Sequence, residues 1–570
     1  MPRPATSRPS GEPRSTVTTA PPEAAAWSPH LIPIGFGILC FLMCLFPMRD
    51  TDIYWHIRTG ELIWERMSIP AVDLYTYTDF DKRWIDLHWC FQLLTAGLYH
   101  LSGVNGLILF KAACYTLAVM IGWYATGRTL SPWLKAVIWF PALIAISGRA
   151  YERPEMISLV CLATTLWLLE RLPRYAKRIW LIPALLIVWT NFHALFILGV
   201  VVCGAFVFGG LVRGVLMPRS SLWLDPVLPT RQLILLGGMA LSAPLINPYL
   251  EQGWMFPLEL YRKFSVEHDY YSPRVGEFQQ PIVFLKSSIA KRKLQGKPIG
   301  IGMLFSGEGF VYPLAEFCSF LIAAGTVVLV LFRDRRISIW RTLLLAGFSH
   351  LAWVATRNTN VFALVAASVT CGLLDDSAVA RGKAEASESP RGDQIGAILI
   401  GVMMICVMSG LWGSMAEPGK SFRLGEAKAW FGHEAVKFAG QEGMPQRAFL
   451  AHFGLAGAYI MHNGPEKKVF MDPRLEVCSR RTFEKWDQTL ELMAQGNPAW
   501  EGIVNPDGKG LPAVILDSRS SREVINGMFR IPAWRLVFAD QAAAVFIPAS
   551  LADQLRLPMA DPRPLHQPPN

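Results

Sequence analysis

The feature that most constrains this 570-residue chain is a series of long apolar runs separated by short polar segments. The runs fall at about residues 31–48, 104–126, 133–148, 155–169, 179–191, 194–213, 232–246, 312–332, 338–354, 359–374 and 394–413. Since a bilayer-spanning helix needs roughly 20 apolar residues, the boundaries of the shorter runs are approximate. The pattern predicts an α-helical polytopic membrane protein with about eleven transmembrane helices.

The composition agrees with a membrane protein. Hydrophobic residues make up 52% of the chain and charged residues only 17%, and the mean hydropathy is +0.30, which excludes an ordinary soluble enzyme. The net charge of +10 comes from short basic clusters between the apolar runs, so we expect no nucleic-acid partner. All the cysteines except Cys478 lie in or beside apolar runs, and no CxxC motif predicts a disulfide framework or a zinc site.

The basic clusters predict the topology. If residues 1–30 are a disordered cytoplasmic tail, the positive-inside rule is satisfied at every second loop. The residues concerned are Arg128, Arg171, Arg174, Lys177, Arg178, Arg213, Arg219, Arg231, Arg333, Arg335, Arg336 and Arg341. Residues 31–414 then form the membrane domain, with outer loops at 49–103 and 247–311 and a structureless cytoplasmic linker at 375–393. The amphipathic stretch Leu87 to Leu101 is expected to lie along the membrane interface.

From about residue 415 the apolar stretches become shorter and alternate with polar, helix-like sequence. The strand candidates include RAFL, KKVFMD, PAVILD and the two halves of WRLVFADQAAAVFIP. This alternation predicts a small soluble α/β domain over 415–570. The parity of the helices places it outside the cytoplasm, and we expect the whole protein in a bacterial inner membrane.

The same parity places many unusual polar residues on the outer side. They are Asp50, Asp52, His56, Arg149, Glu152, Arg153, Glu155, Asn191, His193, Asn247, Glu277 and Arg357. Ionisable residues at helix ends are costly unless they face water or a polar ligand, so their convergence predicts a site at the outer surface.

The most informative segment is RDTDIYWHIRTGELIWE, where Asp50 and Asp52 precede a predicted short helix and His56 lies one turn after Asp52. One interpretation is that an acid here caps the helix N-terminus. A cap needs one acid, however, and does not explain the arginines and histidines predicted opposite the pair.

The order of short motifs along the chain resembles that of a group of bacterial membrane proteins with the GT-C glycosyltransferase fold. The matching residues are Asp50, Asp52, Trp55, His56, Gly60, Pro70, Asp73, Thr78, Trp84, Arg149, Arg153, Pro154, Trp189, Asn191, His193, Asn247, Pro248, Tyr249, Glu277, Phe278, Pro281, Asp472 and Arg474. The sequence departs from the group's pattern at Tyr54, His88 and Gln92. The resemblance implies transfer of a sugar from a polyprenyl-phosphate carrier in the membrane to an extracytoplasmic acceptor.

That reaction needs a base for the acceptor and positive charge for the leaving phosphate. We assign Asp52, assisted by Asp50 and His56, to catalysis, with the two acids as ligands if a divalent cation is used. The substrate-binding candidates are Arg149, Arg153, Asn191, His193, Glu277 and Arg357. Alternatively, the arginines pair with Glu152 or Glu155, Asn191 ties helices together, the histidines are structural donors, and Asp472 and Arg474 form a salt bridge.

Two other functional classes remain open. A lipid-sugar transporter or flippase would have broken helices and charges near the midplane, which the sequence does not clearly contain. A noncatalytic scaffold with the GT-C fold is also compatible with the apolar pattern. The acid pair in the first outer loop favours an enzyme over both.

Overall fold

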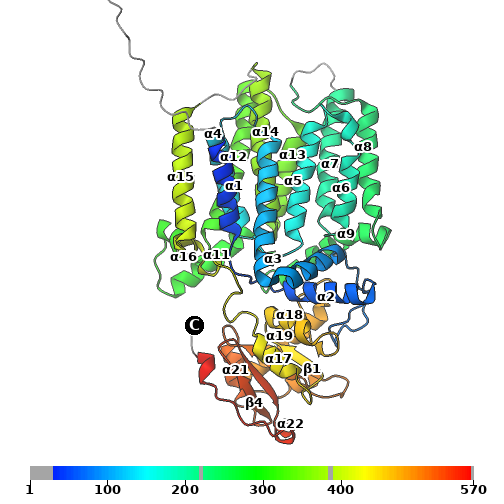
Figure 1. Cartoon of the computed structure of the whole chain (residues 1–570), viewed down its shortest axis with the longest axis vertical. Helices are drawn as coiled ribbons and strands as arrows, with labels where there is room; N and C mark the ends of the chain where they lie inside the picture. The colour runs from blue at the N-terminus through cyan, green and yellow to red at the C-terminus, as the bar shows by residue number, and fades with distance from the viewer. Residues whose placement is uncertain (1–29, 217–221, 383–388, 567–570) are drawn as a thin grey trace, which may run out of the picture.

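The computed structural model describes residues 30–216, 222–382 and 389–566, so the predicted tail at 1–30 lies almost entirely outside the described residues. Every apolar run predicted from the sequence contains a helix. These helices are α1 (Leu31–Cys44), α3 (Trp89–Ala125), α4 (Pro132–Ser147), α5 (Glu155–Arg171), α6 (Leu181–Thr190), α7 (Phe196–Leu211), α8 (Thr230–Ser242), α12 (Val311–Asp334), α13 (Ile339–Val354), α14 (Thr359–Ala380) and α15 (Pro390–Met408). They stand side by side as one bundle (Figure 1).

The length and composition of these helices identify a multi-pass membrane protein. Within the described ranges, five helical segments are long and apolar enough to cross a bilayer. They are Trp89–Ala125, Phe196–Val215, Val311–Asp334, Thr356–Ala380 and Pro390–Met408. α1, α4 and α6 are shorter apolar helices. A helix satisfies its own backbone hydrogen bonds, which is why apolar segments adopt this form in lipid.

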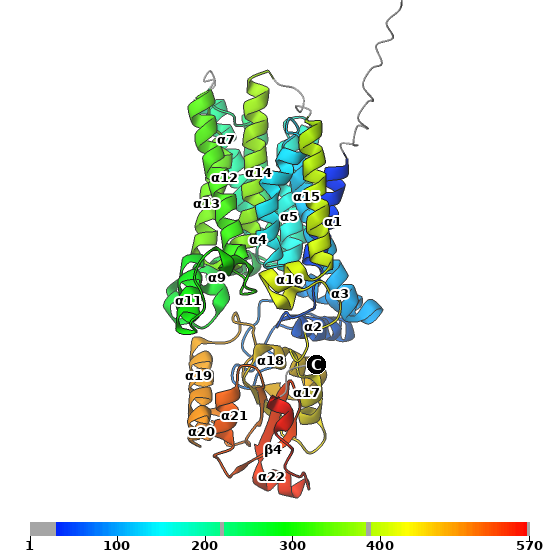
Figure 2. The same ribbon diagram turned by 90° about the vertical axis from the view of Figure 1, so that its left-hand side faces the viewer.

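One end of the bundle carries further helices, all but the last of which fall in the predicted outer loops. They are α2 (Ile53–Arg66), α9 (Glu251–Val266), α10 (His268–Tyr271), α11 (Pro281–Leu294) and α16 (Leu411–Ala416). α3 bends at Gly103, which has a φ of 61°, a value that glycine adopts readily. The first part of α3 therefore turns away from the bundle axis (Figure 2). The amphipathic stretch that begins near Leu87 is therefore helical and lies across the end of the bundle.

The predicted structureless linker at 375–393 is helical at both ends. α14 continues to Ala380, and α15 begins at Pro390, while residues 383–388 lie outside the described part. The polar residues extend the helix because they find partners: Asp375 accepts the backbone N–H of Thr129 at 2.7 Å, and Asp376 pairs with Arg341. Sequence composition alone could not reveal those partners.

The C-terminal region is a mixed α/β structure, as predicted. Its elements are α17 (His433–Gly440), β1 (Arg447–Leu450), α18 (Phe453–Asn463), β2 (Lys468–Val469), α19 (Arg480–Gln495), α20 (Trp500–Val504), β3 (Ala513–Asp517), α21 (Arg522–Met528), β4 (Trp534–Ala539), β5 (Ala543–Pro548) and α22 (Ala549–Gln554). The strand order is β2-β1-β3-β5-β4. β1 runs parallel to its neighbours β2 and β3. β5 runs antiparallel to its neighbours β3 and β4. All five residues of the central strand β3 are buried, which explains its continuous apolar sequence.

The boundary between the two parts lies later than residue 415. Lys420 donates to the carbonyl of Gly148 at 2.5 Å and pairs with Glu417 at 2.8 Å, so this segment stays with the membrane part. One cluster of buried apolar residues runs from Phe36 in α1 through Ile57 in α2 to Ile515 in β3. The C-terminal region therefore shares its core with the membrane part.

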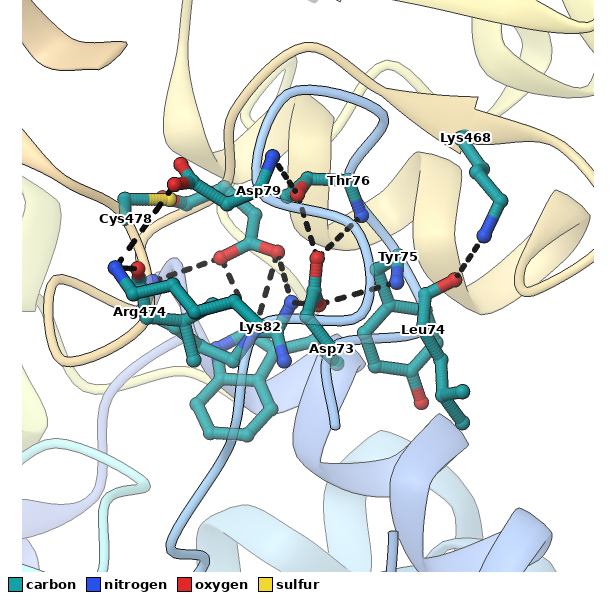
Figure 3. Close-up of polar contacts among 12 residues, drawn as sticks. Asp73, Leu74, Tyr75, Thr76, Asp79, Lys82, Lys468, Arg474 and Cys478 are labelled. Carbon is teal, nitrogen blue, oxygen red and sulfur yellow. Dashed lines mark hydrogen bonds and ion pairs between the residues drawn. The ribbon is translucent and has the colours of Figure 1, made fainter. Parts of the chain in front are cut away.

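The first outer loop is joined to the C-terminal sheet through a buried ion cluster (Figure 3). Thr76 forms a parallel bridge with Val469 at the edge strand β2. The side chain of Arg474 is fully buried and pairs with both Asp73 and Asp472. Its pair with Asp472 is the salt bridge that the alternative interpretation of these two residues predicted. Asp73 also accepts the backbone N–H groups of Tyr75 and Thr76 at 3.1 and 3.0 Å, so the loop is fixed at its turn.

Candidate functional site

The two acids after α1 have different environments. Asp50 accepts the backbone N–H of Asp52 at 2.8 Å, and Arg153 Nε donates to it at 2.5 Å. Asp52 Oδ2 lies 3.2 Å from Arg153 Nη2. The Asp50 side chain is only 1% exposed and the Asp52 side chain is 20% exposed, so a ligand can reach Asp52 but not Asp50.

Asp52 does not cap the helix that follows it. It occupies the N-cap position of α2, but its side chain accepts no capping hydrogen bond. The carboxylate is directed to Arg153 instead. The helix-cap interpretation of Asp52 is therefore wrong.

A third acid comes from the second outer loop. Glu277, in the short 3-10 helix η4 (Gly276–Phe278), accepts two hydrogen bonds from Arg153 Nη1 at 2.7 and 2.9 Å. Arg149 Nη2 lies 3.5 Å from the same carboxylate. The neighbouring Phe278 belongs to a buried cluster shared with the C-terminal region, which includes Phe483. The C-terminal region thus helps to fix the position of Glu277.

Arg357 approaches the cluster from the segment between α13 and α14. It lies in the 3-10 helix η6 (Thr356–Asn358), and its guanidinium sits 5.2 Å from the centre of the Phe278 ring. Thr356 donates its backbone N–H to Gln279 at 3.0 Å, which ties η6 to the loop that carries Glu277. Among the described ion pairs Arg357 has no carboxylate partner within salt-bridge distance.

The electrostatics distinguish the acids further. Burial raises the pKa of Asp52 to about 7, with the neighbouring Asp50 adding to the rise and Arg153 opposing it. Burial also acts to raise the pKa of Glu277, but Arg153 and Arg149 outweigh it and lower that pKa to about 2. At neutral pH Glu277 is ionised, whereas Asp52 exchanges its proton close to neutrality.

Three histidine rings lie one after another near the site. The ring centres of His56 and His88 are 5.6 Å apart, and those of His88 and His193 are 5.3 Å apart. His56 is 2% exposed, and burial lowers the pKa of both His56 and His193 well below the usual value. His193 Nδ1 is hydrogen-bonded to Ser158 Oγ at 2.7 Å. The side chains of His56 and His193 are therefore buried within the protein.

Asn191 is held by three hydrogen bonds. Its amide donates to the carbonyls of Ile187 and Ile246 at 2.8 and 2.9 Å, and its oxygen accepts Trp89 Nε1 at 3.1 Å. Asn191 also lines an apolar cavity of about 600 Å³ between the start of α3, the end of α6 and the turn after α8. It connects helix ends, as the alternative interpretation stated, at the edge of that cavity.

Several predicted neighbours lie elsewhere. Glu152 does not pair with the arginines, because Lys111 lies 2.8 Å from it in a fully buried pair. Glu155 forms no salt bridge within the described part of the chain. Asn247 organises its own turn, with its oxygen accepting the backbone N–H of Tyr249 at 2.7 Å.

Sequence reasoning missed Glu476, which follows Arg474 in the C-terminal region. Its negative charge contributes to the raised pKa values of both Asp52 and His88, so it lies near the acid pair. Lys263 of α9 holds this segment by donating to the carbonyls of Leu475 and Cys478. The only sequence signal was its place two residues after the motif at Asp472 and Arg474.

The residues present do not fit the divalent cation considered for the acid pair. Arg153 already pairs with both Asp50 and Asp52. Within residues 30–216, 222–382 and 389–566, no group of three or more His, Cys, Asp or Glu side chains is arranged to hold a metal ion.

No protein-family model and no curated protein matches the sequence. Among solved structures, the apo crystal structure of the oligosaccharyltransferase of Archaeoglobus fulgidus is similar, with a TM-score of 0.51 and 11% identity over 87% of this chain and 70% of that chain. The same enzyme tethered to an acceptor peptide containing the NVT sequon gives a TM-score of 0.48 and 12% identity over 94% and 75% of the two chains. The first likeness shows that the chain shares its fold with this oligosaccharyltransferase over most of its length.

Proposed function

We propose that the protein is a membrane glycosyltransferase that moves a sugar from a polyprenyl-phosphate carrier to an extracytoplasmic acceptor. The observation that carries the proposal is Asp52, a partly exposed carboxylate with a pKa of about 7 beside Arg153, which also pairs with Glu277. The fold shared with an oligosaccharyltransferase supports the reaction class, although fold alone does not fix the chemistry.

Asp52 is the base in this proposal. It takes the proton from the nucleophilic atom of the acceptor as that atom bonds to the anomeric carbon of the sugar. The bond between that carbon and the phosphate oxygen breaks, and its electrons leave with the phosphate. A base with a pKa near the working pH is well matched to this proton transfer. Asp50 is too buried to reach the acceptor and instead orients Asp52 and Arg153.

The arginines divide into two roles. Arg153 pairs with Asp50, Asp52 and Glu277, so its charge is already used within the protein. Arg149 forms a 3.5 Å ion pair with Glu277, but its buried Nε and Nη2 have no hydrogen-bond partner in the described structure, and Arg357 has no acid partner among the described ion pairs. We assign the leaving phosphate to Arg149 and Arg357, because guanidinium forms paired hydrogen bonds with phosphate oxygens.

The apolar cavity beside Asn191 is our candidate for the carrier's hydrocarbon chain. Ile187, Val188, Leu245 and Ile246 contribute to its lining, at the end of the bundle that carries the acids. The row of histidines connects this region with Asp52, and we assign His56 and His193 to positioning rather than proton transfer.

The acceptor would approach from the C-terminal region, where Glu476 borders the site. The positive-inside pattern supports an extracytoplasmic place for this region in a bacterial inner membrane, and we retain about eleven spans for residues 31–414.

The test is a transfer assay on the purified full chain with a polyprenyl-phosphate sugar and a mixture of envelope acceptors. The wild type should transfer labelled sugar, and Asp52→Asn should lose about 100-fold or more of the rate while it keeps donor binding. If the wild type binds the donor but transfers no sugar to any acceptor, a noncatalytic scaffold would be favoured. Movement of the donor across proteoliposome bilayers without transfer would favour a flippase.

A further inference from the structure

The end of the bundle away from Asp52 contains a cavity of about 560 Å³. It lies between the ends of α3, α5, α7 and α14 and the segment that precedes α13. Four arginines line it, namely Arg128, Arg174, Arg213 and Arg336. A cavity of this volume falls within the range of pockets that bind small ligands.

The acids of the cavity are already engaged by the protein. Arg341, which is not part of the lining, donates to both oxygens of Glu170 at 2.6 and 2.9 Å and also pairs with Asp376. The third acid, Asp375, accepts the backbone N–H of Thr129 at 2.7 Å. With Arg341 included, five arginines face three carboxylates, so the group keeps a formal net charge of +2.

The lining arginines, by contrast, are largely without acid partners in the described part of the chain. Arg213 donates to the backbone carbonyl of Asp225. Arg128, Arg174 and Arg336 form no ion pair or side-chain hydrogen bond with any residue of the described ranges. Like charges gathered around one cavity repel each other, so an anion placed between them would be stabilised. Guanidinium groups match phosphate oxygens through paired hydrogen bonds.

We propose that this cavity binds a phosphate group, carried either by an anionic lipid headgroup or by a soluble phosphate compound. The cavity lies at the ends of membrane helices that the basic loops place on the cytoplasmic side, where anionic headgroups are present. Its position at the opposite end of the bundle makes it separate from the proposed transferase site.

The test measures binding to the purified full chain in detergent. Native mass spectrometry follows phosphatidylglycerol against phosphatidylcholine, and calorimetry follows inorganic phosphate. Preference for phosphatidylglycerol supports a lipid ligand, and binding of inorganic phosphate supports a soluble one. The combined Arg128→Gln, Arg174→Gln and Arg336→Gln variant should weaken the observed binding by about tenfold or more, since it removes three charge-assisted contacts.

The matched control removes three basic residues from the same end outside the cavity, through Lys177→Gln, Arg178→Gln and Arg333→Gln, and should keep binding. A second variant, Ala380→Trp, fills the cavity without removing charge and should lose binding, which guards against misfolding of the triple variant. Equal loss in the control, retained binding in Ala380→Trp, or no binding of either ligand by the wild type would overturn the proposal.

Discussion

Replacing Asp52 by Asn should separate catalysis from stability in a way that depends on pH. The pKa of Asp52 rises from 3.8 to about 7 on folding, mainly through burial, so its ionisation disfavours the folded state. Stability from this group is therefore complete below about pH 4 and falls as pH rises toward 7. The shift of about three units corresponds to at most about 4 kcal/mol.

Asp52→Asn cannot ionise, so it avoids that loss. Above pH 7 the variant should unfold at the same temperature as the wild type or higher, while transfer falls by about 100-fold or more. In the wild type, transfer should increase as pH rises through about 7, because the base must be deprotonated.

The assay combines thermal unfolding of the purified protein at pH 5 and pH 8 with transfer rates across the same range. Glu277→Gln is the matched control. Arg153 and Arg149 outweigh burial and lower the pKa of Glu277 from 4.5 to about 2, so its ionised form stabilises the fold and its loss should destabilise the protein at pH 8, by at most about 3 kcal/mol. Wild-type transfer by Asp52→Asn, or equal destabilisation by the two variants, would refute the reasoning.

Three further outcomes are expected. Arg357→Gln should weaken donor binding by about tenfold with little change in unfolding temperature. Arg153→Gln should lower the unfolding temperature, because Asp50 and Asp52 lose their arginine partner and Glu277 keeps only Arg149. The reverse result would exchange the two roles. Arg474→Met should cost about 3–5 kcal/mol and make the C-terminal region sensitive to limited proteolysis, and unchanged resistance would contradict its bridging role. A cysteine that replaces Lys509, whose side chain is 75% exposed, should react with a membrane-impermeant thiol reagent in intact spheroplasts. A cysteine that replaces Lys177 should react only after the membrane is permeabilised. The opposite labelling would invert the topology.

The segment around Asp50 shows how far local sequence reasoning extends. The acid pair and the helix after it were predicted, because a short helix follows from local residue preferences. The sequence could not determine which acid reacts, since exposure of 1% against 20% depends on packing by distant segments. It also treated Arg149, Arg153 and Arg357 as equivalent, and only their partners distinguish them.

The contribution of the C-terminal region illustrates the same limit. Its strands were predicted from alternating apolar stretches, but Glu476 was not associated with Asp52, which lies more than four hundred residues earlier. Folding brings them together because Arg474 connects Asp73 with Asp472 and because Lys263 holds the same segment. Local periodicity carries no information about such long-range pairing.

The sequence by itself determined that this chain enters a membrane as a set of apolar helices, which end of the bundle is basic, and that an α/β region follows. These properties depend on hydrophobicity and charge along a single dimension, and the bilayer acts on each segment separately. Only the tertiary structure decided that Arg153 holds three acids, that Asp52 remains reachable, and that Arg128, Arg174 and Arg336 border one cavity. The physical reason is that the burial and charge of each group depend on neighbours supplied by several distant segments.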